Sequence, residues 1–286
     1  ETNSEGRTQS ATRLLEGLGE GIIGDAATEK FEGEFVAEHA LMAVHTPLPI
    51  DSTLLTSVLR ERGLSATSLN NYFYRNVLRI PEVQAESAQF GTALHDTLRS
   101  VMKYRREHGE LPSTTLLKSY LENELGKLSI TPQEYVRLHE RALVALAQYL
   151  EHVSSSLPHE TKEEYKIQVV MKTGNEEFPE ILLTGQLDRL DFDSSGKILR
   201  VVDYKSGKPK TRGYIEGTTK DSTGDYKRQL VFYALILSLM EDDRYETREG
   251  LLSFVEADEK GKIHEEAYSI TSEEIEDLKE EIVRVV

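Results

Sequence analysis

The chain has 286 residues, with 34 Lys and Arg against 50 Asp and Glu, which gives a formal net charge of −16. Taken alone, this charge argues against a protein that coats a nucleic-acid backbone, because such proteins carry a basic footprint. The absence of Cys excludes disulfides, Cys-ligated zinc, iron–sulfur clusters and thiol nucleophiles, so any metal must be bound by oxygen or imidazole. No stretch approaches the roughly 18 apolar residues of a membrane span, and no secretory signal is present. We therefore expect a cytoplasmic protein with no membrane contact.

The first 60 residues contain no motif and no repeat. The sequence begins at Glu1 rather than at Met, residues 16–24 are rich in Gly and acidic residues, and Pro47 and Pro49 close the segment. We expect residues 1–60 to be a connector or the end of a preceding domain. Residues 61–286 are expected to form the main domain, which is long enough to bury a sizeable core.

Helical patterns fill the first half of the main domain. Ser65 and Ser68 are candidate caps for a short helix that ends near Tyr72. Apolar residues then recur at helical spacing, and helices are predicted at 90–104, 113–125 and 131–153. Thr131, Pro132 and Glu134 define the start of the last helix through a capping box and a Pro at its first position. We predict a helical segment over residues 91–155, ahead of the strands.

After this segment the periodicity changes to that of strands. β-rich runs cover 165–171, 180–192 and 197–205, and residues 193–196 (Asp-Ser-Ser-Gly) form a hairpin turn between the last two. The elements predicted after them are a polar loop at 206–224, an apolar helix at 225–240, strands at 250–255 and 262–268, and an acidic helix at 271–285. This order predicts an α/β fold with a mixed central sheet flanked by helices.

The chemical signal lies in two neighbouring strands. Because side chains alternate along a strand, Asp203 and Lys205 project to one face, and Val202 and Tyr204 project to the other. Asp188 and Asp203 are about equally far from the hairpin turn, so a simple hairpin places them roughly opposite one another. Two carboxylates that close repel each other unless one is protonated or a cation lies between them. A hard divalent metal is the natural resolution.

Each of these residues also has a simpler interpretation. An Asp-x-Lys pair on a strand is most often an exposed ion pair that contributes little to stability. His95 follows Leu94 in an amphipathic helix, where a single His is more often a surface or core-edge residue. Gln229 and Tyr233 share one helix face, but Tyr233 would ordinarily pack in the core and Gln229 would cap a backbone group. The residues alone leave both interpretations open.

Five segments, taken together, resemble a known family. They are 64–72 (LSATSLNNY), 90–95 (FGTALH), 185–191 (GQLDRLD), 202–208 (VDYKSGK) and 226–233 (YKRQLVFY). In order and spacing they resemble the successive motifs of RecB-type nucleases of the PD-(D/E)XK superfamily. The closest resemblance is to the nuclease domain at the C-terminal end of bacterial superfamily 1 helicases of the UvrD/Rep type. This resemblance implies a restriction-endonuclease-like fold with an α-helical insertion before the catalytic strands.

The resemblance also implies roles for individual residues. The implied metal ligands are His95, Asp188, Asp203 and the backbone carbonyl of Tyr204, and the implied catalytic residues are Asp188, Asp203, Lys205, Gln229 and Tyr233. The metal would be Mg²⁺ or Mn²⁺, and an imidazole ligand favours Mn²⁺. The implied function is a metal-dependent DNA nuclease, an exonuclease on single strands or duplex ends, covalently linked to a superfamily 1 helicase in DNA repair or recombination.

Two departures from the family pattern stand out. Many relatives carry Cys-Pro after the Tyr of the first motif, and some use this Cys in an iron–sulfur cluster. Here Phe73 follows Tyr72 directly, so the stretch looks several residues short, and the lack of Cys excludes the cluster. The alternative functions are a nuclease fold kept as a DNA-guiding or protein-docking module without cleavage, and a free-standing exonuclease.

The acidic chain still carries local groups of basic residues near these motifs. They are Arg99, Lys103, Arg105, Arg106, Lys205, Lys208, Lys210, Arg212, Lys227 and Arg228. We expect them to form a narrow basic channel that admits one phosphate chain, with weak affinity for DNA elsewhere.

Overall fold

The computed structural model describes residues 85–285, except 177–178, 241, 243–244 and 246. The connector at 1–60, the motif at 64–72 and the short stretch at Tyr72 and Phe73 lie outside the described residues. The helices are α5 (Glu86–His108), α6 (Thr114–Leu125), α7 (Pro132–Val153), α8 (Arg212–Ile215), α9 (Asp225–Ser238) and α10 (Ser272–Val285). The strands are β1 (Glu160–Lys172), β2 (Glu180–Phe192), β3 (Ile198–Lys205), β4 (Glu249–Phe254) and β5 (Glu265–Ser269).

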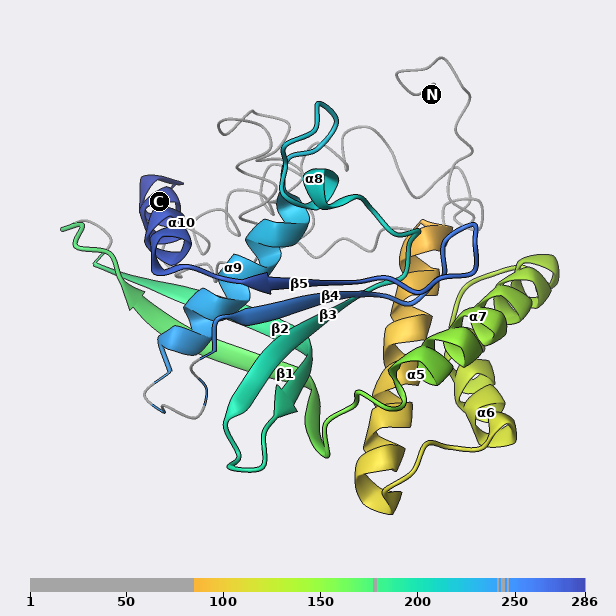
Figure 1. Ribbon diagram of the computed structural model, residues 1–286. Helices are drawn as coiled ribbons and strands as arrows, with labels where there is room; N and C mark the ends of the chain where they lie inside the picture. The colour runs from red at the N-terminus through yellow and green to blue at the C-terminus, as the bar shows by residue number, and fades with distance from the viewer. Residues whose placement is uncertain (1–84, 177–178, 241, 243–244, 246, 286) are drawn as a thin grey trace, which may run out of the picture.

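The described strands form one five-stranded sheet in the order β1-β2-β3-β4-β5 (Figure 1). Neighbouring strands are antiparallel except β3 and β4, which are parallel. A parallel pair needs a crossover connection, and α9 lies in the segment between these two strands. The predicted mixed α/β fold is therefore confirmed, and it has the arrangement of a restriction-endonuclease-like domain.

Helix α7 begins as its sequence predicts. The Thr131 backbone N–H donates to Glu134 Oε2 at 2.7 Å, and the Glu134 N–H donates to Thr131 Oγ1 at 3.3 Å. Helix α5, by contrast, covers Glu86–His108 and so extends beyond both ends of the helix predicted at 90–104. Gly91 lies inside the helix, where a Cβ atom would be 2.8 Å from Ser206 Oγ. This glycine allows α5 to approach the turn that follows β3.

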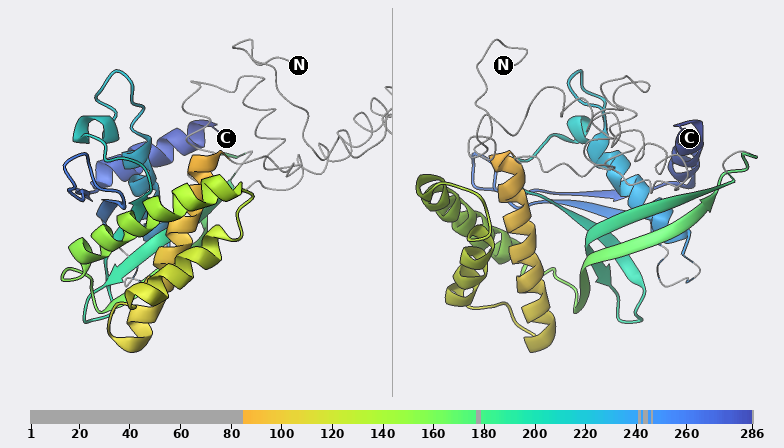
Figure 2. Two further views of the ribbon diagram at one scale, coloured as in Figure 1. Left: turned by 90° about the vertical axis from the view of Figure 1, so that its right-hand side faces the viewer. Right: turned by 180° about the vertical axis from the view of Figure 1, so that it is seen from behind.

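Helices cover both faces of the sheet (Figures 1 and 2). On one face, α9 and α10 pack on Leu183, Leu187 and other apolar residues of the strands. On the other face, α5, α6 and α7 share a second core with Val202 and Tyr204 of β3. The two cores together contain most of the buried apolar side chains, so β3 is covered on both sides. None of the described helices combines the length and the apolar character needed to cross a bilayer.

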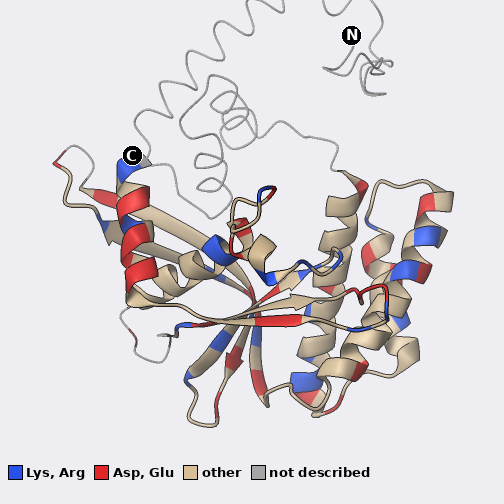
Figure 3. Ribbon diagram, turned by 45° about the horizontal axis from the view of Figure 1, so that its top comes forward, with Lys and Arg blue, Asp and Glu red and all other residues tan. Residues whose placement is uncertain are grey.

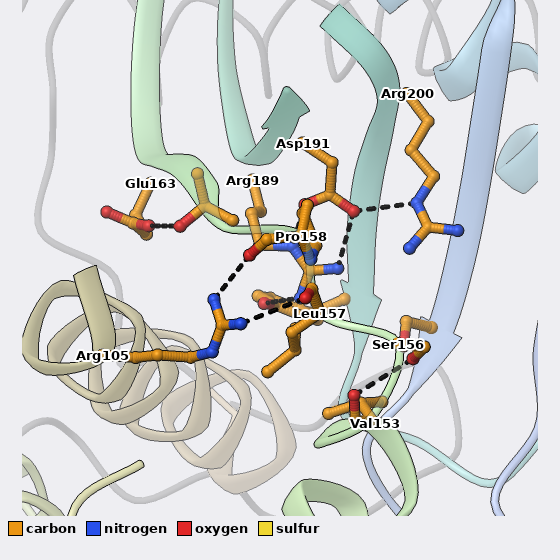
Figure 4. A network of polar contacts seen from close by, with 12 residues as sticks. Arg105, Val153, Ser156, Leu157, Pro158, Glu163, Arg189, Asp191 and Arg200 are labelled. Carbon is orange, nitrogen blue, oxygen red and sulfur yellow. Dashed lines mark hydrogen bonds and ion pairs between the residues drawn. The ribbon is translucent and has the colours of Figure 1, made fainter. Parts of the chain in front are cut away.

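A buried polar network fixes the pairing of β2 with β3 (Figure 4). Asp191 accepts hydrogen bonds from Arg189 Nε at 2.6 Å and from Arg200 Nε at 2.8 Å. Arg189 Nη1 donates to the Tyr204 hydroxyl at 2.8 Å. Arg189 is 1% exposed and Asp191 is 0% exposed, so each charge depends on its partner for stabilisation. The network thereby ties Tyr204, the residue between Asp203 and Lys205, to the neighbouring strand.

Replacement of Asp191 by Ala is expected to destabilise the fold by about 3–5 kcal/mol, because it leaves the buried Arg189 charge without its carboxylate. Arg200→Ala is the matched control. The Arg200 side chain is 33% exposed, and its loss leaves Arg189 paired with Asp191. Urea unfolding of the two variants measures the difference. Equal losses of stability would contradict the central role of the Arg189–Asp191 pair.

Candidate metal and catalytic site

The hairpin of β2 and β3 brings Asp188 next to the residues that end β3. Arg189 pairs with Val202 and Leu190 with Val201, beyond a bulge between Asp191 and Phe192 that shifts the register of the predicted simple hairpin. Asp188 and Asp203 are the next residues beyond these pairs. Asp188 Oδ2 accepts a hydrogen bond from the backbone N–H of Tyr204 at 2.7 Å. The middle of β2 and the C-terminal end of β3 therefore hold the two carboxylates.

Asp203 and Lys205 lie side by side, as strand alternation predicts. Lys205 Nζ is 2.6 Å from Asp203 Oδ2. The Lys205 side chain is 15% exposed and the Asp203 side chain is 2% exposed, so the alternative of an exposed ion pair is wrong. Asp203 Oδ2 is buried and makes no hydrogen bond of good geometry among the described residues. The contact of Asp203 Oδ2 with Lys205 is therefore mainly electrostatic.

Helix α9 holds Lys205 at the C-terminal end of β3, the central strand of the sheet. Lys205 Nζ donates to Gln229 Oε1 at 2.8 Å, and Gln229 Nε2 donates to the Tyr233 hydroxyl at 2.7 Å. The Tyr233 hydroxyl donates in turn to the Gln186 carbonyl at 3.4 Å. Tyr233 does pack in the core, at 3% exposure, but Gln229 binds Lys205 rather than capping a backbone group. The chain of hydrogen bonds fixes which end of the Gln229 amide faces the lysine.

Helix α5 contributes His95 to the same place. His95 Nδ1 lies 3.5 Å from Asp188 Oδ1, and the His95 ring meets the Tyr204 ring edge-on with centroids 5.8 Å apart. Ligand atoms of His95, Glu164 and Asp188 all lie within 4.8 Å of one another. An imidazole and two carboxylates at this separation suit a hard or borderline divalent ion.

Glu164 was not among the site residues predicted from the sequence. It belongs to β1, which begins at Glu160 and not near Tyr165 as predicted. Its φ is 49°, the only positive φ of a non-glycine residue in the described part of the chain. The pairing of β1 with β2 continues on either side of it, from Glu163 with Arg189 to Tyr165 with Leu187. Strand alternation alone does not predict the direction of the Glu164 side chain, because this direction depends on a local irregularity of the backbone.

Comparison with protein families decides the assignment. The model of the PD-(D/E)XK nuclease superfamily matches residues 66–286, more than half of the chain. The chain belongs to the PD-(D/E)XK nuclease superfamily. A search of curated proteins finds no match to the chain. The described fold, with its mixed sheet and flanking helices, agrees with this family.

The charges of the PD-(D/E)XK site favour a cation. Burial, with a smaller contribution from Asp188, raises the pKa of Asp203 above its ordinary value of 3.8, against the opposing effect of Lys205. Burial opposes the charge on Lys205, but Asp203 and Asp188 outweigh it and raise the pKa of the ammonium above 10.5. Lys205 is therefore charged at neutral pH, and one lysine faces more than one carboxylate. A divalent ion would relieve this excess of negative charge, so the residues present fit the metal that the family implies.

Most of the basic residues near the site form ion pairs or hydrogen bonds within the described part of the fold. Ion pairs join acidic residues to several of them: Arg99 to Asp96, Arg106 to Glu163, Lys208 to Glu259, Arg212 to Glu216 and Glu266, Lys227 to Glu274, and Arg228 to Asp225 and Glu281. Arg105 instead donates to the carbonyls of Leu157 and Pro158. Figure 3 shows acidic positions interspersed with the basic ones and concentrated on α10. Most of the local positive charge is already neutralised by the fold.

Titration of His95 tests this geometry in the metal-free protein. Burial alone would lower the pKa of His95, but the hydrogen bond and charge of Asp188, aided by Asp203 and Glu164, outweigh it and raise the pKa above 6.5. The folded state therefore binds this proton more tightly than the unfolded state. Its contribution to stability is complete below about pH 6.5 and is lost as the pH rises through the folded-state pKa.

We expect His95→Gln to remove this pH-dependent stability, measured by urea unfolding between about pH 5 and 8 together with an NMR titration of the His95 ring. His159→Gln is the control, because His159 is exposed and is not one of the groups that shift the pKa of His95. A folded-state pKa at or below the ordinary value would contradict the close approach of His95 to Asp188.

Proposed function

We propose that this protein is a Mg²⁺- or Mn²⁺-dependent deoxyribonuclease of the RecB type, which hydrolyses phosphodiester bonds of single strands or duplex ends in the cytoplasm. The observation that carries the proposal is a buried lysine, paired with Asp203, at the strand end where His95, Glu164 and Asp188 converge. A structural ion pair requires no such neighbouring group of ligands. An enzyme that must neutralise a phosphate and activate water requires both.

The protein residues that would hold the metal are His95 and Asp188, with Asp203 and the Tyr204 carbonyl as further predicted ligands. A bound divalent ion would lower the pKa of a water molecule and polarise a phosphoryl oxygen. Asp203 Oδ2 lies 2.6 Å from the Lys205 ammonium, so Asp203 would bind the metal as a carboxylate shared with this lysine. The Tyr204 side chain is held by Arg189, so only its backbone is available to the site.

Lys205 acts in this proposal as a cationic donor. Its raised pKa keeps the ammonium protonated, and a protonated lysine cannot accept a proton from water. It can donate hydrogen bonds to the phosphate oxygens where negative charge increases in the transition state. Gln229 and Tyr233 are positioning residues, since they fix Lys205 through the hydrogen bonds from α9. Their contact with the DNA strand stays a prediction.

The neutralised surface supports a nuclease that receives its substrate from another protein. The ion pairs near the site leave little unpaired positive charge to attract DNA, and the chain as a whole has a net charge of −16. Affinity for DNA then depends on the metal, on Lys205 and on a partner that delivers the strand. A covalently linked superfamily 1 helicase, acting in DNA repair or recombination, would supply this delivery and favour an exonuclease mode.

Lys205→Ala is expected to lower kcat for cleavage of single-stranded DNA by about 100-fold or more, because it removes a preorganised donor. Asp203→Ala is expected to abolish Mg²⁺- or Mn²⁺-dependent cleavage as well. The matched control is Lys197→Ala, which removes an exposed lysine just before the opposite end of β3. Cleavage is measured with end-labelled DNA, and circular dichroism verifies that each variant is folded.

Full metal-dependent cleavage by the Asp203→Ala protein would exclude the proposed function. A wild-type protein that neither binds Mn²⁺ nor cuts DNA would instead fit a silent DNA-guiding or docking module.

A further inference from the structure

Two adjacent glutamates of β1 have different partners. Glu163 accepts hydrogen bonds from Thr161 Oγ1 and Arg106 Nη1, each at 2.5 Å. Glu164 accepts a hydrogen bond from Gln186 Nε2 and pairs with no Lys or Arg among the described residues. Glu163 therefore has a structural partner of opposite charge, whereas Glu164 presents a carboxylate that no protein cation within the described residues neutralises.

The neighbours of Glu164 are metal-ligating groups. Its ligand atom, one from His95 and one from Asp188 all lie within 4.8 Å of one another. These three side chains come from β1, α5 and β2, which are separate in the chain, so their convergence is a property of the tertiary fold.

Asp203 is not part of this group of three, and it pairs with Lys205. A carboxylate shared with an ammonium group at 2.6 Å is a weaker ligand for a second cation than one with no opposite charge beside it. Within the described residues, the most favourable metal ligands are therefore His95, Asp188 and Glu164 of β1.

We propose that Glu164 is a side-chain ligand of the divalent ion, together with His95 and Asp188. This inference rests on the proposed function, because it assigns a further ligand to the same site. The Gln186 amide donates a hydrogen bond to one carboxylate oxygen of Glu164, and the other oxygen can bind a metal. The backbone of Glu164, with a φ of 49°, sets the direction of the side chain. Such an outer partner orients a ligand and lowers its freedom before the metal binds.

The test is calorimetric titration of the full chain with Mn²⁺ alone, in the absence of DNA. Glu164→Gln keeps the size of the side chain and removes its charge, and it is expected to weaken Mn²⁺ binding by about 10- to 100-fold. Glu163→Gln is the matched control, since it removes the same charge one residue away, and its affinity is expected to stay close to that of the wild type. Glu164→Asp keeps the carboxylate, and binding is expected to fall between the two.

A second readout is the increase in unfolding temperature that Mn²⁺ produces, which follows metal affinity without requiring activity. Smaller increases for Glu164→Gln than for Glu163→Gln support the assignment. Wild-type affinity in Glu164→Gln, together with lost binding in Asp188→Asn, would overturn the role of Glu164 and leave the proposed function intact. Equal weakening in Glu163→Gln and Glu164→Gln would also overturn it, because the effect would then come from long-range charge alone.

Discussion

The buried pair of Asp203 and Lys205 is the constraint on which the site depends. Neither charge is tolerable at the end of β3 without compensation, because each has been removed from water. Lys205 is held by Asp203 on its own strand and by Gln229 on α9. The residue between the pair, Tyr204, is fixed to β2 through Arg189 and donates its backbone N–H to Asp188. Errors in strand register would therefore leave several buried polar groups unsatisfied together.

The position of β3 between two apolar cores explains why helices from both faces reach one site. Val202 and Tyr204 face the core of α5–α7, and α9 lies against the opposite face. His95 comes from the first layer, and Gln229 comes from the second. Because the apolar parts of these helices are anchored in separate cores, their polar side chains are preorganised at the strand end before any metal or DNA is bound.

The acidic charge of the chain agrees with activity at a single place rather than with general DNA binding. Ion pairs such as Arg228 with Asp225 and Lys227 with Glu274 use the basic residues near the site for the fold itself. These half-buried pairs reduce the potential that attracts a phosphate backbone. A nuclease with this surface would recognise DNA chiefly through the reacting phosphate and depend on delivery.

The sequence by itself determined what local periodicity and short turns control. Strand alternation placed Asp203 beside Lys205, and Thr131 marked the start of α7. The register that brings Asp188 close also depends on a bulge between Asp191 and Phe192, which a simple hairpin does not predict. Helical spacing also placed Gln229 and Tyr233 on one face, although their link to Lys205 needed the packed helix. Only the tertiary structure decided the contribution of Glu164 and the pairing of the basic residues. The physical reason is that the ion pairs and the position of Glu164 depend on contacts between distant segments. The direction of Glu164 also depends on one irregular backbone conformation, which periodicity and propensity do not predict.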